Sequence, residues 1–200
     1  LLNIFTIITG GPGSGKTTTV AKILSLLLDL NPDMKVALAA PTGKAAARMA
    51  ESLKETASKN EISLSEKAKA LFAALEPSTI HRLLGARPNE IYFKRNSENP
   101  IPFDLIIVDE SSMIDVALFA KLMDAVKPET KVIFLGDKDQ LASVEAGSLF
   151  GDLCTAQNRL NMFSPDRADF INSIMPEGKT KLLQENIEES NHPLFEHIIE

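Results

Sequence analysis

The chain has 200 residues, a formal net charge of −6 at pH 7 and a hydrophobic fraction of 44%. A chain of this length buries roughly 70% of the surface that it exposes when unfolded, so this composition fits a globular protein and excludes disordered and fibrous classes. The acidic balance argues against a surface that is basic throughout, but it does not exclude a local groove for nucleic acid. The one cysteine, Cys154, excludes an internal disulfide framework and favours a reducing compartment, so we expect a cytoplasmic protein.

Hydropathy along the chain predicts no membrane span. No apolar run reaches the roughly 18 residues that a membrane-spanning helix needs. The apolar start, Leu1 to Ile8, lacks the basic leader and the small-residue cleavage site of a signal peptide. Because the first residue is not Met and the chain opens inside a strand-like run, we expect it to be part of a longer protein.

Short apolar runs alternate with helical patterns through the first two thirds of the chain. The runs typical of strands covered on both faces are Ile4–Ile8, Val36–Ala40, Leu105–Val108 and Val132–Leu135. Helical patterns run up to Leu30, from Gly43 to about Lys54, from Ser63 to Leu75, from Thr79 to Leu84 and from Leu118 to Val126. The pattern from Ser63 to Leu75 begins with a capping box. This alternation implies right-handed crossovers, so we predict an α/β fold with a mostly parallel sheet and helices on both faces.

Two segments depart from the alternation. Residues 86–103 carry three prolines around Ile91–Phe93, and we interpret them as an excursion from the sheet, with a hairpin as one form that it could take. After Leu153 the pattern weakens, and only Lys181–Ile187 and Leu194–Ile199 look helical. We therefore predict a main domain over residues 1–153 and a weakly patterned, helical, truncated segment over residues 154–200.

A glycine-rich segment between the first predicted strand and the first predicted helix indicates a phosphate site. Gly10 to Thr17 satisfies G-x-x-x-x-G-K-[ST] in the structural context that this motif requires. Its backbone N–H groups and the helix N-terminus favour anionic oxygens, so Lys16 should bridge the β- and γ-phosphates of ATP and Thr17 should bind Mg²⁺. The candidate nucleotide-binding residues are Gly10, Gly11, Pro12, Gly13, Ser14, Gly15, Lys16, Thr17 and Thr18. The alternative is a plain glycine-rich turn with an exposed lysine.

Polar side chains follow the last two predicted strands of the main domain. Asp109 suits the Mg²⁺ carboxylate of such a site, and Glu110 is placed to orient or deprotonate an attacking water. Gln140 can bond a γ-phosphate or its water, so the candidate catalytic residues are Lys16, Glu110 and Gln140. The alternatives are a strand-to-helix turn capped by serines and a solvated polar loop. Adjacent carboxylates speak against a small-molecule kinase, in which water attack would waste ATP.

The motifs and their order resemble those of the superfamily 1 helicases. The segments that carry the resemblance are Gly10–Thr19, Ala40–Ala46, Ser78–Gly85, Val108–Met113 and Gly136–Leu141. Two longer phrases, Arg82–Asp115 and Val132–Leu153, look most like the RecD subunits of exodeoxyribonuclease V. The resemblance is dense over about residues 3–153 and weak beyond them.

This resemblance implies a RecA-like P-loop NTPase, the first motor domain of a 5′-to-3′ DNA helicase that acts in double-strand break repair and homologous recombination. It implies ATP and Mg²⁺ as cofactors, and single-stranded DNA, duplex ends and the bacterial RecB and RecC subunits as partners. The family's single-strand contacts match Pro41, Thr42, Gly43, Lys44, Thr79 and His81. Read alone, Thr42 to Lys44 would be a helix cap with a solvated lysine.

Two features of the family pattern are missing, and two other classes of function stay open. The second motor domain, which supplies arginines to the γ-phosphate, has no counterpart after Leu153, and the upstream adenine-reading glutamine segment is absent. The chain alone should therefore bind nucleotide weakly and hydrolyse it very slowly. The other classes are a non-motor P-loop kinase and a nucleotide-responsive assembly module that binds partners through residues 154–200.

Overall fold

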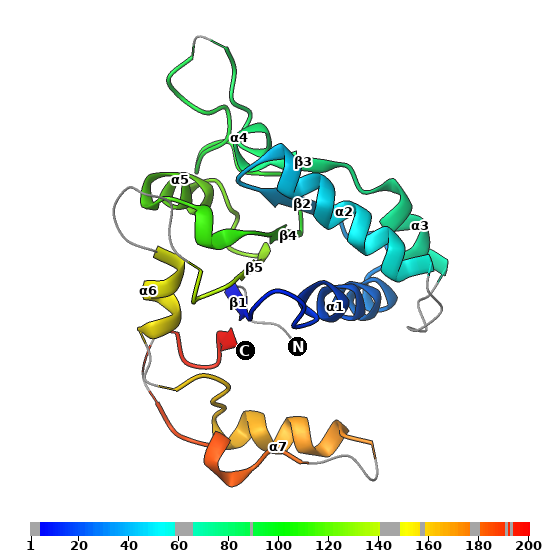
Figure 1. Ribbon diagram of the computed structural model, residues 1–200, viewed down its shortest axis with the longest axis vertical. Helices are drawn as coiled ribbons and strands as arrows, with labels where there is room; N and C mark the ends of the chain where they lie inside the picture. Colours follow the sequence, from blue (N-terminus) through cyan, green and yellow to red (C-terminus); the bar gives the residue numbers. More distant parts are fainter. Residues whose placement is uncertain are drawn as a thin grey trace.

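The computed structural model describes residues 5–58, 66–88, 90–140, 149–156, 159–176, 181–190, 192 and 194–200. Within these residues the fold is built on one six-stranded sheet (Figure 1). Its strands are β1 (Phe5–Thr9), β2 (Val36–Ala40), β3 (Pro77–Thr79), β4 (Leu105–Val108), β5 (Lys131–Gly136) and β6 (Ile198–Ile199), in the order β3-β2-β4-β5-β1-β6. Every pairing is parallel, which confirms the predicted α/β fold.

Both faces of the sheet are buried, which explains why its central strands read as continuous apolar runs. On β4, Ile107 packs with α1 (Lys16–Leu30), α2 (Gly43–Ser58) and α3 (Glu66–Ala74). The adjacent Ile106 points to the other face, where α4 (Ile80–Leu83), α5 (Val116–Asp124) and α6 (Leu149–Thr155) pack. The helix α7 (Pro165–Ile174) lies apart from the sheet (Figure 1). Two short 3-10 turns complete the elements: η1 (Ser111–Met113) and η2 (Gln184–Asn186).

The structure corrects the prediction in the last part of the chain. Leu194–Ile199 is not helical: a turn leads into β6, which pairs with the open edge of β1 and buries Ile198. Lys181–Ile187 holds only η2. The i, i+4 spacing of apolar residues there misled the prediction because an available sheet edge overrides local periodicity. In contrast, α7 was not predicted, although Ser164 caps it and Pro165 stands in its first turn, the pattern that begins many helices.

Other predictions meet the structure unevenly. The short strand β3 was not predicted, and it precedes α4 where only a turn of helix was expected. The capping box at Ser63 lies outside the described residues, which resume at Glu66. In the 86–103 excursion, Asn96 and Asn99 form an isolated antiparallel bridge, and the hairpin stays a prediction. The boundary at residue 153 also stays a prediction.

In the part of the chain with described coordinates, no helix has the length and apolar character to cross a membrane.

The topology fixes where a ligand can bind. Because all strands run parallel, their carboxyl ends meet at one edge of the sheet, where the ligands of open α/β sheets bind. The loops after β1, β2, β4 and β5 and the helix α4 directly after β3 all begin there, and predicted site residues lie at each of these strand ends.

Candidate nucleotide site

The loop between β1 and α1 has the backbone geometry of an anion cradle. Gly13 and Gly15 adopt left-handed conformations with φ of 78° and 87°, which a residue with a side chain adopts only with strain. Gly15 is the N-cap of α1, and the carbonyl oxygen of Gly15 accepts from the N–H of Thr19 at 2.9 Å. The first N–H groups of α1 therefore open toward the loop, where they can meet anionic oxygens.

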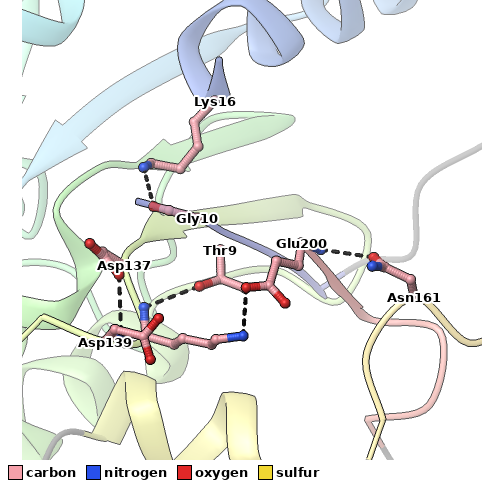
Figure 2. Close-up of polar contacts among 8 residues, drawn as sticks. Thr9, Gly10, Lys16, Asp137, Asp139, Asn161 and Glu200 are labelled. Carbon is pink, nitrogen blue, oxygen red and sulfur yellow. Dashed lines mark hydrogen bonds and ion pairs between the residues drawn. The ribbon is translucent and has the colours of Figure 1, made fainter. Parts of the chain in front are cut away.

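Lys16 reaches back across this loop. Its Nζ donates to the carbonyl oxygen of Gly10 at 2.5 Å (Figure 2). It also donates to the carbonyl oxygen of Gly11 at 3.1 Å. The N–H of Gly10 donates to the carbonyl oxygen of Gly136 at 3.2 Å, so the loop starts from a fixed point on β5. The ammonium group thus lies over the loop's own carbonyl oxygens, and phosphate oxygens of a bound nucleotide would replace these as its partners.

Asp109 stands directly after β4 at the same edge of the sheet. Its N–H donates to the carbonyl oxygen of Ala39 at 2.9 Å, and its Oδ1 accepts from the N–H of Glu110 at 2.9 Å. Burial raises the pKa of the Asp109 carboxyl, and the Glu110 charge adds to this; the hydrogen bond from Glu110 and the charges of Lys16 and Arg48 oppose it. A carboxylate whose charge is poorly solvated is a good site for a cation.

Glu110 has an unusual backbone. Its φ of 52° and ψ of 40° place it in the left-handed region, which non-glycine residues seldom occupy. The turn leads at once into η1, and the hydroxyl of Ser111 donates to the carbonyl oxygen of Val108 at 3.0 Å. Strained residues of this kind persist where the surroundings fix them, and they cluster at functional sites.

Gln140 is tied to the same turn. It follows β5, its N–H donates to the carbonyl oxygen of Asp137 at 3.2 Å, and its Oε1 accepts from the Ser112 hydroxyl at 3.0 Å. The loop after β5 and the Asp109–Glu110 turn after β4 are therefore joined side chain to side chain. The structure brings together Lys16, Asp109, Glu110 and Gln140, as predicted from the motifs, although their roles stay predictions.

The two loops predicted to contact DNA lie beside each other at the end of β2 and β3. Ala40 of β2 is in register with Thr79 of β3, and a Cβ on Gly43 would lie 3.9 Å from the methyl group of Thr79. The hydroxyls of both threonines cap helices: Thr42 accepts from the N–H of Ala45 at 3.2 Å, and Thr79 from that of Arg82 at 3.1 Å. The cap interpretation of Thr42 is confirmed, and the exposed side chain of Lys44 completes it.

His81, the last predicted DNA contact, is exposed and packs edge-on against Phe93, with ring centroids 5.8 Å apart. Phe93 belongs to the 86–103 excursion, so this contact joins the excursion to α4. Pro41 is half-buried between β2 and α2. The DNA-binding role of all these residues stays a prediction.

Comparison with known proteins defines the family. Residues 2–146 match the family described as "AAA domain". The chain belongs to the AAA domain family. Membership implies nucleotide use, and the glycine-rich loop at the edge of a parallel sheet confirms the predicted RecA-like P-loop fold of this AAA domain.

The resemblance to RecD subunits is also confirmed. This AAA domain is 45% identical to the RecBCD enzyme subunit RecD of Haemophilus influenzae over 172 residues, which cover 84% of this chain and 26% of the relative. The RecD subunit of Mycolicibacterium smegmatis is 46% identical over 74% of this chain and 27% of its own. The ATP-dependent RecD2 DNA helicase of Deinococcus radiodurans is 42% identical over 70% and 16%. The chain thus spans about a quarter of the length of the RecD relatives.

Among solved structures, unliganded Pif1 from Bacteroides sp matches over 72% of this chain and 30% of its own, at 23% identity. The TM-score of 0.40 is low, and the fold assignment rests on the sheet itself.

The residues around the AAA domain's loop fit a nucleotide with Mg²⁺. The described residues contain no cluster of three or more His, Cys, Asp or Glu side chains that could hold a metal on their own. Mg²⁺ does not need one, because it keeps several waters and takes one or two carboxylates together with substrate phosphates. Thr17 in the first turn of α1 and the half-buried Asp109 supply the hydroxyl and the carboxylate for such a site.

Sequence reasoning missed three residues of the site. Ser112 was interpreted as a cap, yet it is buried and holds Gln140. Thr9, a buried polar residue at the end of β1, accepts from the N–H of Lys138 at 3.1 Å. Arg48 of α2 acts electrostatically on Asp109. A polar residue at the carboxyl end of an otherwise apolar strand was the only available signal, and it applied to Thr9 alone.

We expect Asp109→Asn to stabilise the nucleotide-free AAA domain at pH 7. The pKa of Asp109 is raised in the folded state, so ionising this carboxyl costs more free energy in the folded protein than in the unfolded chain. Its stabilising contribution is therefore fully present below the unfolded pKa and is lost as pH rises through the folded pKa. Asparagine keeps the acceptor for Glu110 without the buried charge. Thermal melts should show a higher Tm for the variant at pH 7 and a shrinking difference toward pH 4; about 1 kcal/mol shifts Tm by about 2 to 4 °C at this size. An equal or lower Tm at pH 7 would contradict the burial argument.

Proposed function

We propose that this chain is the ATP-binding motor domain of a RecD-type 5′-to-3′ DNA helicase, a subunit of exodeoxyribonuclease V in double-strand break repair and homologous recombination. The motor role belongs to residues 1–153, and residues 154–200 form a weakly patterned segment that follows them. The observation that carries the proposal is the convergence of the Gly10–Thr17 loop, the Asp109–Glu110 turn and Gln140 at one sheet edge. The 45% identity to a RecD subunit supports the same assignment.

The chemistry follows from the groups at this edge. The loop amides and the Lys16 ammonium bind the phosphates of ATP, and Thr17 with Asp109 would hold Mg²⁺. Mg²⁺ held there would supply positive charge that offsets the negative charge of the phosphates. Glu110 accepts a proton from the attacking water at its carboxylate, and the Gln140 amide orients that water. The Ser112 hydrogen bond to Gln140 joins the loop that carries Glu110 to the loop that carries Gln140.

DNA would bind at the neighbouring part of the same edge. The ends of β2 and β3 carry Pro41 to Lys44, Thr79 and His81, and β2 is hydrogen-bonded to β4, which Asp109 directly follows. Backbone N–H groups and Lys44 suit phosphate contacts on single-stranded DNA or duplex ends, which position the strand without reading its sequence. The Asp109–Ala39 hydrogen bond links the two regions directly. RecB and RecC are the proposed protein partners, in the bacterial cytoplasm.

Lys16→Gln in the full-length protein, assembled with its partner subunits, tests this proposal. Glutamine removes the charge that faces the developing negative charge on the phosphates, and losing one such electrostatic group costs about 10²- to 10³-fold in kcat. ATP hydrolysis is measured at saturating single-stranded DNA, with the other motor subunit inactivated. Lys22→Gln is the matched control, because Lys22 is an exposed lysine on the same helix, and it should leave the rate unchanged.

Three outcomes would contradict the motor assignment. Unchanged hydrolysis in Lys16→Gln would show that the loop does not serve catalysis. Phosphate transfer to a small acceptor by the unmodified protein would favour the P-loop kinase. Nucleotide binding by the complete chain without any hydrolysis would favour the assembly module.

A further inference from the structure

Three strands end side by side next to the glycine-rich loop. The sheet order places β1 between β5 and β6, and Ile8 of β1 is in register with Ile199 of β6. Because β6 is parallel to β1, the residue after it, Glu200, emerges at the same edge as Thr9 and Gly10 (Figure 2). A segment distant in sequence thus reaches the edge that carries the candidate nucleotide site.

Lys138 spans the ends of these three strands. It lies in the loop after β5, and its N–H donates to the hydroxyl of Thr9, which is only 2% exposed, at 3.1 Å. Its side chain extends past the end of β1 to Glu200, where Nζ lies 2.5 Å from Oε1. We call Thr9, Lys138 and Glu200 the strand-end clasp.

The clasp belongs to the loop that presents Gln140. Gly136, just before that loop, accepts from the N–H of Gly10, and Gln140, four residues later, accepts from Ser112. Lys138 stands between these two fixed points. Asp137 also holds the loop, since its Oδ1 accepts from the N–H of Asp139 at 3.0 Å (Figure 2). Loss of the side-chain link to Glu200 would therefore leave this part of the loop held by its backbone bonds alone, without the side-chain contact that ties it to β6.

The other end of the clasp is anchored to the α7 region. The N–H of Glu200 donates to Oδ1 of Asn161 at 2.8 Å. Four residues earlier, Oε1 of Glu196 accepts from both the N–H and the hydroxyl of Ser164, each at 2.6 Å, at the start of α7. A displacement of α7 would thus move β6 and Glu200 with it, and Lys138 would follow.

We propose that Lys138 and Glu200 are positioning residues for nucleotide hydrolysis: the clasp holds the Gln140 loop in register with the glycine-rich loop and couples it to α7. This inference rests on the proposed function. The clasp lies outside the anion cradle of residues Gly10–Thr17. It therefore affects how Gln140 and the attacking water are aligned, and it does not affect how tightly the nucleotide binds. The predicted signature is a fall in kcat without a change in nucleotide affinity.

The test uses the full-length protein with Lys138→Met, Glu200→Gln and the charge-exchanged double variant Lys138→Glu/Glu200→Lys. Each single variant should lower kcat for DNA-stimulated ATP hydrolysis by about tenfold or more, with the Kd for nucleotide changed less than about twofold. The double variant should recover most of the loss, because it restores the ion pair while the backbone bonds to Thr9 and Asn161 stay in place. The side chains are 25% and 41% exposed, so the variants should fold, and nucleotide binding verifies this.

Lys69→Met is the matched control, since it breaks an exposed ion pair to Glu66 on α3, at 2.8 Å, and should leave kcat unchanged. Single variants with normal kcat would overturn the clasp and leave the proposed function intact. A loss of kcat that the double variant does not recover would overturn it too. An unmodified full-length protein that does not hydrolyse ATP would overturn the proposed function, and the clasp with it.

Discussion

The isolated 200 residues should hydrolyse ATP about 10³ to 10⁵ times more slowly than a full-length RecD-type protein that contains them. In related NTPases an arginine that reaches the γ-phosphate from outside the nucleotide domain has an effect of this size, because it neutralises charge that develops in the transition state. The resemblance to superfamily 1 helicases places such arginines in a second motor domain. This chain covers 26% of the Haemophilus influenzae RecD subunit.

Three arginines of the chain itself are poorly placed to substitute. Arg159 donates to the carbonyl oxygen of Glu185, and Arg95 to Asn99 and Pro100, both away from the glycine-rich loop. Arg87 pairs with Glu90 in the excursion after α4. Arg48 differs from these three, since its charge acts on Asp109.

The measurement compares single-turnover hydrolysis by the isolated chain and by the full-length protein, each with saturating single-stranded DNA. Arg48→Ala in the isolated chain is the control for an internal arginine. Robust DNA-stimulated hydrolysis by the isolated chain would contradict the prediction, and its loss in Arg48→Ala would then identify Arg48 as the arginine that acts within the chain.

The sequence predicted the central strands and the glycine-rich loop well because residues adjacent in the sequence determine their structure. The strands β2 and β4 match their predicted bounds, since each is a short apolar run buried on both faces. The glycine-rich loop was equally predictable: Gly13 and Gly15 need conformations that other residues avoid, so the motif encodes its own geometry. Local sequence and tertiary structure agree there.

What the sequence did not reveal depends on distant partners. Ile198 joins a sheet only because β1 has a free edge, and nothing near residue 198 encodes that edge. The pairing of Lys138 with Glu200 joins residues 62 positions apart, and charge alone did not distinguish either from its solvated neighbours. Ser112 likewise becomes part of the site only because the loop after β5 brings Gln140 to it. The motifs therefore predict the candidate site, and the fold adds the contacts between them.

Glu110→Gln in the full-length protein should reduce ATP hydrolysis by about 10²- to 10⁴-fold, the range attributed to a general base, while nucleotide binding persists. Glutamine has the shape of glutamate and no β-branch, so the left-handed backbone at φ 52° is about as unfavourable in free energy for glutamine as for glutamate. The substitution thus removes the proton acceptor and leaves the turn, the Ser111 bond to Val108 and the Ser112 bond to Gln140 in place. A stalled complex with bound nucleotide and DNA is the expected state of this variant.

The matched control is Glu129→Gln, an exposed glutamate before β5 that should change neither rate nor affinity. Hydrolysis is followed in a single turnover, and nucleotide binding is measured separately by equilibrium titration, because a general base affects the chemical step and not the ground-state complex. If Glu110→Gln also abolished binding, the residue would belong to the cradle; if it hydrolysed ATP normally, the proton would go elsewhere. A selective loss of the chemical step assigns the strained turn after β4 to catalysis, since the substitution alters its charge without altering its backbone.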